Sequence, residues 1–142
     1  GGGRAPRWAA AGWGSDRRPS PPALLRSAAM ATTHDLTDQT AADALIDSDQ
    51  PAWIFKHSAA CPVSAAARRQ FDAFRADRSE LPAGVVTVQT DRPVSNHIAK
   101  RTGVRHATPQ AMLVQGGEVL WHASHGAITE DRLAEAEAEA GQ

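Results

Sequence analysis

The chain has 142 residues, which is the length of one domain with a single core. Its first 29 residues hold five arginines and one aspartate, a balance of +4, and because the whole chain carries −1 the remainder carries −5. An acidic domain argues against a nucleic-acid-binding surface, where clustered Lys and Arg are expected. No apolar run approaches the roughly 20 residues that span a bilayer. We therefore expect a cytoplasmic protein that has neither nucleic acid nor a membrane as a partner.

Residues 1–34 differ in composition from the rest of the chain. They are rich in Gly, Pro, Ala and Arg and have no sustained apolar period, so they cannot bury enough surface to offset the entropy of ordering. We predict a disordered or spurious N-terminal extension, with Met30 as the true first residue in the second case. The apolar stretch at 21–25 is too short for a signal peptide, and a transit peptide is the weaker alternative. The folded domain is predicted over 35–142.

The first half of this domain has the pattern of a helix, a strand and a second helix. Apolar spacing after Thr37 or Asp38, either of which can act as N-cap, predicts the first helix. A short apolar run opened by a proline predicts a strand over 52–57, and the stretch 61–77 is the clearest amphipathic helix. The predicted buried positions are Ala41, Ala44, Leu45 and Ser48 in the first helix and Val63, Ala67, Phe71 and Phe74 in the second, whose predicted polar face holds Arg68, Arg69, Asp72 and Arg75.

A further strand and helix follow. The β-branched stretch 85–90 predicts a buried strand. A short helix is predicted over 95–103, because Ser95 is a favourable N-cap residue and Gly103 a favourable stop.

The C-terminal part has the pattern of a hairpin and a closing helix. Strands are predicted over 110–115 and 118–124. Gly116-Gly117 between them predicts a two-residue turn, because only glycine accepts the positive φ angles of such a turn at little cost. Thr129 is the expected N-cap of the last helix, whose first acidic residues suit the positive end of the helix dipole.

Two strand–helix–strand units followed by an antiparallel hairpin indicate an α/β fold. The expected architecture is a thioredoxin-like three-layer sandwich, with a mixed, mostly four-stranded sheet and helices on both faces.

The chain has one cysteine, Cys61, so it cannot form an internal disulfide. Cys61 follows a predicted strand and precedes Pro62, and proline suits the first position of a helix because its fixed φ is helical and its missing N–H is not needed there. Cys61 is therefore the predicted N-cap, and its sulfur could accept a hydrogen bond from the N–H of Val63 or Ser64. The helix dipole favours a negative charge at this position.

A thiol at a helix start is better suited to disulfide exchange than to hydrolysis. Such thiols have pKa values lowered from about 8.5 to roughly 3.5–7.5. A fall from 8.5 to 6.5 raises the thiolate fraction at pH 7.4 about twelvefold. It lowers the intrinsic nucleophilicity roughly six- to tenfold, so the main gain is the quality of the sulfur as a leaving group.

The motif Cys-Pro-Val-Ser places Ser64 where a dithiol motif has its second cysteine. Ser64 can form hydrogen bonds but cannot resolve a mixed disulfide, so resolution must come from an external thiol. Thr108-Pro109 precedes the predicted strand at 110–115, where a thioredoxin-like fold holds a cis-proline beside the active cysteine. Cis X–Pro bonds are only about 5–6% of those in folded proteins, so this prediction is specific. The alternatives are a helix start without a redox role and a trans-proline opening a strand.

These motifs resemble the YtxJ-type monothiol bacilliredoxins of the bacillithiol system. The matching segments occur in order over roughly 50–130 and are "KHS" at 56–58, "CPVS" at 61–64, "SNHIA" at 95–99, "TGVRHATPQ" at 102–110 and "WHASHGAIT" at 121–129. The resemblance implies a thiol–disulfide oxidoreductase that removes bacillithiol or another small thiol from S-thiolated proteins. It implies no cofactor beyond that small thiol as co-substrate. Cys61 would be the nucleophile, and Pro62, Ser64, Thr108 and Pro109 would contact the substrate.

Several other side chains lie near the motif in the sequence and could contribute to the site. Lys56 and His57, which end the strand before Cys61, are candidate stabilisers of the thiolate, with solvated loop cations as the alternative. His122 and His125 should point to opposite faces of a strand end, so no metal site is predicted. Two other classes stay open beside the reductase. One is a module that binds a small thiol or an iron–sulfur cluster through Cys61, and the other is a non-catalytic adaptor.

Overall fold

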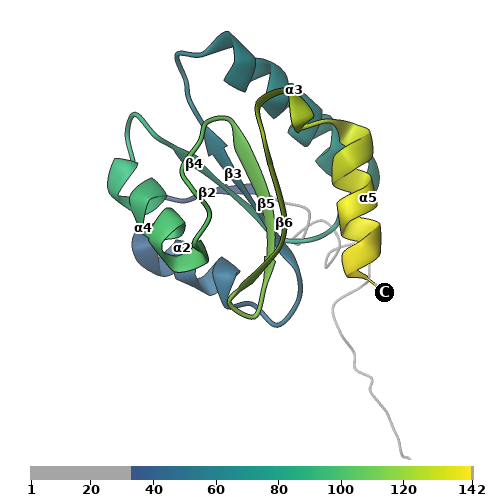
Figure 1. The fold of residues 1–142 in the computed structure, drawn as a ribbon, viewed down its shortest axis with the longest axis horizontal. Coiled ribbons are helices and arrows are strands. Elements are labelled where there is room, and N and C mark those ends of the chain that lie inside the picture. Colours follow the sequence, from purple (N-terminus) through teal and green to yellow (C-terminus); the bar gives the residue numbers. More distant parts are fainter. Residues whose placement is uncertain (1–32, 142) are drawn as a thin grey trace, which may run out of the picture. The chain divides into compact units, whose positions relative to one another are not determined.

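The computed structural model describes residues 33–141, so residues 1–32 of the extension predicted over 1–34 lie outside them. The described chain forms a central sheet with helices on both faces, a three-layer α/β sandwich (Figure 1). None of its helices is long and apolar enough to cross a membrane. Its elements are β2 (Thr33–Asp35), α2 (Gln39–Ile46), β3 (Ala52–His57), α3 (Pro62–Arg78), β4 (Ala83–Thr87), α4 (Arg92–Thr102), β5 (Gln110–Gln115), β6 (Glu118–Ser124), the 3-10 turn η1 (His125–Ala127) and α5 (Glu130–Ala140).

The sheet has five strands in the order β2-β4-β3-β5-β6, one more than the four that the sequence predicted. β4 pairs in parallel with both β2 and β3, whereas β5 is antiparallel to β3 and to β6. The additional strand is β2, which begins at Thr33 inside the segment assigned to the extension. Its residues are mostly exposed and polar, so the sequence has no apolar pattern there that would predict a strand.

Alternation along β3 divides the interior into two cores. Trp53 and Phe55 face α3 and α5, where Trp53 makes an edge contact with Phe74 at a centroid distance of 5.5 Å. Ile54 faces α2 and α4 in the second core. Because side chains alternate across a strand, Lys56 follows Ile54 to the second side and His57 follows Phe55 to the first.

Two helix faces differ from the predicted ones. α2 buries Ala42 and Ile46, while Ala44 is exposed, because this rotation buries the larger apolar side chain of Ile46 against the sheet. In α3, Ala67, Phe71 and Phe74 are buried as predicted. Val63 is 49% exposed because it lies in the first turn of the helix, and Arg75 is buried although it was placed on the polar face.

Two element boundaries also differ. α4 begins at Arg92 with Asp91 as N-cap, and Ser95 lies inside the helix, where its N–H bonds to the Asp91 carbonyl at 3.1 Å. Pro93 fits this earlier start because proline is tolerated in the first turn. β4 covers 83–87 rather than 85–90, because the chain turns at Thr87, whose carbonyl accepts from the Asp91 N–H at 2.9 Å.

The remaining local predictions are confirmed. β3, β5 and β6 have the predicted bounds. Gly116 and Gly117 have φ values of 58° and 86°, and Gly103 ends α4 at a φ of 73°. The Thr129 side chain caps α5 by accepting from the Arg132 N–H.

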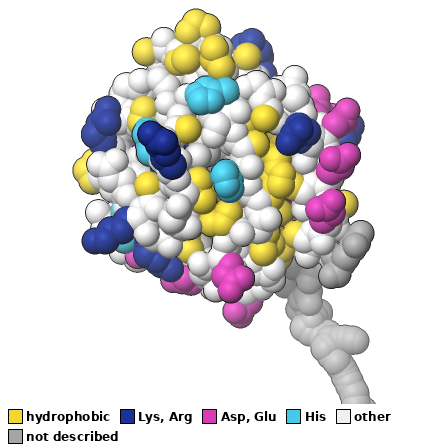
Figure 2. All heavy atoms as spheres, in the orientation of Figure 1, with side chains coloured by type: hydrophobic (Ala, Val, Ile, Leu, Met, Phe, Trp, Pro, Cys, Tyr) yellow, Lys and Arg dark blue, Asp and Glu magenta, His cyan; other side chains and the backbone are white. Residues whose placement is uncertain are grey.

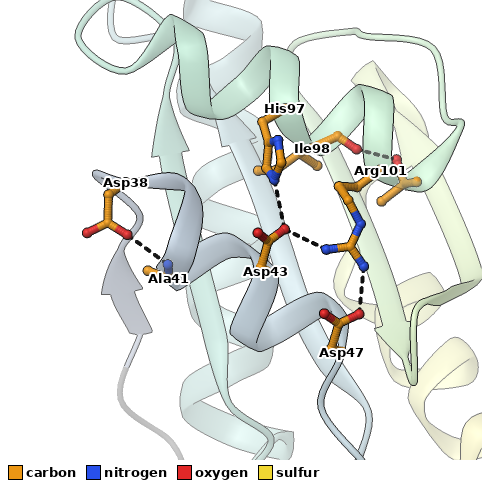
Figure 3. Close-up of polar contacts among 8 residues, drawn as sticks. Asp38, Ala41, Asp43, Asp47, His97, Ile98 and Arg101 are labelled. Carbon is orange, nitrogen blue, oxygen red and sulfur yellow. Dashed lines mark hydrogen bonds and ion pairs between the residues drawn. The ribbon is translucent and has the colours of Figure 1, made fainter.

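A charged cluster on the surface joins α2 to α4 (Figure 3). Asp43 Oδ1 lies 2.7 Å from His97 Nε2 and 2.6 Å from Arg101 Nη1. Arg101 also donates through Nη2 to Asp47 Oδ1 at 2.6 Å. The cluster therefore ties together the two helices that cover the second core.

Candidate active site

Cys61 lies in the connection between the end of β3 and the start of α3. It is the N-cap of α3, with an extended backbone at φ −111° and ψ 122°, and Pro62 follows it at the first helical position. The Cys61 carbonyl accepts the first helical bond from the Ala65 N–H at 3.0 Å. The predicted placement of the thiol at a helix start is thus confirmed, and the thiol is free and half-buried.

The expected cap by the sulfur itself is wrong. The side chain of Cys61 accepts no hydrogen bond from the first turn of α3. Sulfur is a weak acceptor, so a cysteine N-cap gains little from such a bond. The lone pairs of the Cys61 sulfur are therefore not used in hydrogen bonds to the N–H groups of the first helical turn.

Ser64 organises the loop that carries Cys61. Its side chain is fully buried, and its Oγ accepts from the Ser58 N–H at 2.9 Å. The same oxygen lies 3.1 Å from His57 Nδ1, to which its hydroxyl can donate. Burial, and after it the charge of Arg68, lowers the pKa of His57, which favours the neutral ring that can accept this bond. Ser64 therefore acts as an anchor beneath the loop.

Gln89 holds the same loop from the neighbouring connection after β4. Its Oε1 accepts from the Ala59 N–H at 3.0 Å, and its Nε2 donates to Ser58 Oγ at 2.7 Å. Gln89 could not be predicted from the sequence, because a glutamine beyond a strand end belongs to no pattern that indicates a role. Together Ser64 and Gln89 fix the approach to Cys61 from two sides.

Thr108-Pro109 is a cis peptide bond, as the sequence predicted. The pairing of Lys56 with Gln110 puts Pro109 next to the C-terminal end of β3, the end from which the Cys61 loop departs. Pro109 is buried, and its carbonyl accepts from the His125 N–H at 3.0 Å. Within the described chain the backbone of Thr108 has no hydrogen-bond partner, so its N–H and C=O are available to a bound chain.

The two cations proposed as thiolate stabilisers lie on opposite faces of the sheet. His57 contacts the Phe55 ring on the α3 side, at a centroid distance of 6.2 Å. Lys56 points to the other side, where its Nζ lies 3.2 Å from His106 Nδ1. Burial lowers the pKa of Lys56 to about 8. The structure therefore brings His57, and not Lys56, to the start of α3.

An open groove of about 300 Å³ lies beside the first turns of α3. Val63 and Ala66 line it from α3, and His125 and Gly126 line it from η1. His125 has a positive φ of 58°, which is uncommon for a residue other than glycine. Hydrophobic side chains gather over the start of α3 at the top of the molecule, and acidic ones line the side of α5 (Figure 2). The first turns of α3, which follow Cys61, thus carry an apolar surface that a partner can contact.

Comparison with known proteins identifies the family. The profile of the family described as "Monothiol bacilliredoxin BrxC" matches residues 34–133. The chain belongs to the monothiol bacilliredoxin family. The predicted resemblance is thus confirmed, and the family is one of thioredoxin-fold thiol–disulfide oxidoreductases.

Solved structures show the same fold. The bacilliredoxin-family chain is 34% identical to a proposed oxidoreductase with a thioredoxin fold, with a TM-score of 0.69 over 80% of this chain and 98% of the other. It is 13% identical to the long form of spinach chloroplast thioredoxin f, with a TM-score of 0.63 over 84% of this chain and 95% of that one. It is 11% identical to thioredoxin from Trypanosoma brucei brucei, with a TM-score of 0.63 over 78% and 91% of the two chains. These likenesses confirm the thioredoxin-like fold class.

Proposed function

We propose that this protein removes a low-molecular-weight thiol, bacillithiol in the first instance, from mixed disulfides on other proteins. The observation that carries the proposal is a single free thiol at the start of α3, after the same end of β3 beside which cis-Pro109 lies. Membership of the bacilliredoxin family supports the choice of bacillithiol.

The proposed reaction has two exchange steps. The Cys61 thiolate attacks the small-thiol sulfur of the mixed disulfide, the disulfide bond breaks, and the client cysteine leaves as a thiolate that takes up a proton. Cys61 then carries the small thiol. The thiolate of a second small-thiol molecule then attacks the sulfur of the small thiol bound to Cys61. The bond to Cys61 breaks, Cys61 leaves as a thiolate, and the two small-thiol molecules depart joined by a disulfide.

The surrounding residues support this chemistry in different ways. The unpaired backbone of Thr108 can form edge hydrogen bonds to the client chain, while Pro62 and Pro109 flank the disulfide. Ser64 holds the loop and orients His57, which lies on the same side of the sheet as α3. We assign His57 as the neighbour that stabilises the Cys61 thiolate, as a neutral ring whose Nε2–H can donate a hydrogen bond.

The test compares the native chain with Cys61→Ser, using a model protein blocked by bacillithiol as substrate. The native chain should release the small thiol and carry its mass on Cys61 in intact-mass spectra. Cys61→Ser should do neither while it keeps the native melting temperature. Equal activity in both proteins would refute the proposal.

A second arm identifies the small thiol. The native chain is incubated separately with the disulfides of bacillithiol, glutathione and coenzyme A. Bacillithiol should give the fastest adduct on Cys61. Equal rates for all three would leave a general monothiol reductase and contradict the assignment to bacillithiol.

A further inference from the structure

The most unusual polar group in the described chain is a buried lysine. The sequence has two lysines, Lys56 and Lys100, and Lys56 has no exposed surface. A buried ammonium group is costly unless it finds partners. The one hydrogen-bond partner of Lys56 Nζ within the described residues is His106 Nδ1, at 3.2 Å.

The chemistry of this contact fixes the state of His106. A protonated lysine can only donate, so His106 Nδ1 must supply a lone pair, and its ring proton then sits on Nε2. Ser95 Oγ lies 3.3 Å from the same nitrogen. Burial first, and then the charges of Lys56 on β3 and Arg92 on α4, lower the pKa of His106. The neutral ring is thus the form that the surroundings favour.

Gln110 lies directly across the strands from Lys56 and completes the cluster. Its Nε2 donates to the Arg105 carbonyl at 3.0 Å, and it lies 3.4 Å from Ser124 Oγ. Its Oε1 is buried and has no partner within the described chain. Directly opposed side chains on antiparallel strands have Cβ atoms about 4.5–5.5 Å apart, so the side chains of Lys56 and Gln110 leave the same face of the sheet next to each other.

The cluster holds one loop, the connection 103–109 that leads to cis-Pro109. Gln110 holds Arg105, and Lys56 and Ser95 hold His106. The next fixed point is the Pro109 carbonyl, which accepts from the His125 N–H. Thr108 lies between these anchors, so the positions of its free N–H and C=O depend on them.

We propose that Lys56 is a positioning residue, which acts through His106 to place the Thr108 backbone for the incoming disulfide. This inference rests on the proposed function. It replaces the expectation that Lys56 stabilises the Cys61 thiolate, because Lys56 lies on the side of the sheet opposite α3. Loss of Lys56 should therefore weaken docking of the client and leave the reactivity of the thiol intact.

The test is Lys56→Met, which keeps the length of the side chain, with Lys100→Met on exposed α4 as the matched control. A hydrogen bond to a charged group contributes about 1.5 kcal/mol or more, so KM for the blocked protein should rise about tenfold or more. The kcat value and the pH profile of Cys61 alkylation should not change. Lys100→Met should behave as the native chain. An alkylation profile shifted in Lys56→Met would overturn the proposal in favour of a direct effect on the thiolate.

A second pair of variants covers the case in which Lys56→Met fails to fold. His106 is exposed overall, so His106→Ala should fold, and it should show the same rise in KM. His106→Asn presents an amide acceptor near the position of Nδ1 and should restore most of the native KM. Equal KM values for His106→Ala and the native chain would refute the positioning role.

A spectroscopic readout separates this inference from the proposed function. Removing the Lys56 charge should raise the pKa of His106 in an NMR titration, and the chemical shift of the Thr108 amide should change. If the native chain proves inactive, the proposed function fails. The two NMR measurements still test whether Lys56 acts on Thr108 through His106, because they need no activity. An unchanged His106 titration in Lys56→Met would refute the link itself.

Discussion

The two ends of β3 carry two buried polar networks that are built differently. Near its start, Glu137 Oε1 accepts from Trp53 Nε1 at 2.8 Å and from Ser79 Oγ at 2.7 Å. Arg75 donates to Ser79 Oγ at 3.0 Å and to the Leu81 carbonyl. This first network ties β3, α3 and α5 together, and its central acceptor has two donors.

Near the end of β3, the network of Lys56, His106 and Gln110 is open. Lys56 has a single partner, and Gln110 Oε1 has none in the described chain. Because unmade hydrogen bonds of buried groups are costly, such a network contributes less to stability than a closed one. The difference indicates that the closed network serves the fold, while the open one serves the loop before cis-Pro109.

The largest expected effect on stability comes from breaking the closed network. Glu137→Ala leaves the buried Trp53 Nε1–H and the Ser79 hydroxyl without their acceptor, which should lower the free energy of unfolding by about 2–3 kcal/mol. Denaturant unfolding measures this loss. Glu135→Ala, on the exposed face of the same helix, is the control and should have little effect. The alkylation rate of Cys61 should stay native in both, and a slower rate in Glu137→Ala would contradict the division of roles.

The converse change is Gln110→Met in the open network. It removes an unpartnered acceptor together with one hydrogen bond, so the free energy of unfolding should change by less than about 1 kcal/mol. KM for the blocked protein should rise because Arg105 loses its anchor. Gln115→Met, at the other end of β5, should leave KM unchanged. A large loss of stability with native KM in Gln110→Met would show that both networks are structural.

A cysteine at position 64 tests the geometry between the two thiol positions of the motif. In Ser64→Cys the new thiol should attack Cys61 intramolecularly, where effective concentrations exceed those of free thiols by orders of magnitude. The variant should release the small thiol without external help and lose about two mass units as an internal disulfide. Ser64→Ala, which also loses the bond to the Ser58 N–H, is the control and should keep the adduct. A stable adduct on Ser64→Cys would mean that the sulfur of Cys61 does not face position 64.

The sequence predicted most of the fold and the chemical centre of the site. β3, β5 and β6 are apolar runs bounded by proline, glycine or polar residues, so their bounds could be read directly. The cis bond at Pro109 followed from its place before β5 and the nature of the motif at Cys61. β2 could not be predicted, because three polar residues form a strand only when β4 is present to pair with them.

The supporting residues of the site could not be predicted for the same kind of reason. Gln89 and His106 lie in connections, and their roles depend on which loop or side chain the fold brings against them. Lys56 is close to Cys61 in the sequence, which suggests a role at the thiol. Because side chains alternate along β3, however, Lys56 lies on the face of the sheet opposite α3. Serine favours the N-cap position, so the sequence predicts Ser95 as the cap of α4, but Asp91 is the N-cap one turn earlier.

The smallest expected effect concerns the surface cluster between α2 and α4 (Figure 3). The hydrogen bond from His97 lowers the pKa of Asp43 below its ordinary value of 3.8, burial opposes this shift, and Arg101 adds to it. Since the pKa is lowered on folding, the contribution of the pair to stability is present above the ordinary value and is lost as the pH falls through the lowered one. Asp43→Asn should therefore lower the melting temperature slightly at pH 7. The difference in melting temperature between Asp43→Asn and the native chain should narrow in high salt, because the pair is partly exposed, and should close only once the pH falls through the lowered pKa of Asp43. Asp72→Asn removes an exposed pair within a single helix, which contributes little, so its difference in melting temperature from the native chain should be smaller at pH 7. The difference in melting temperature could instead be as large at acid pH as at pH 7. That result would show that the carboxylate charge of Asp43 does not join the two helices.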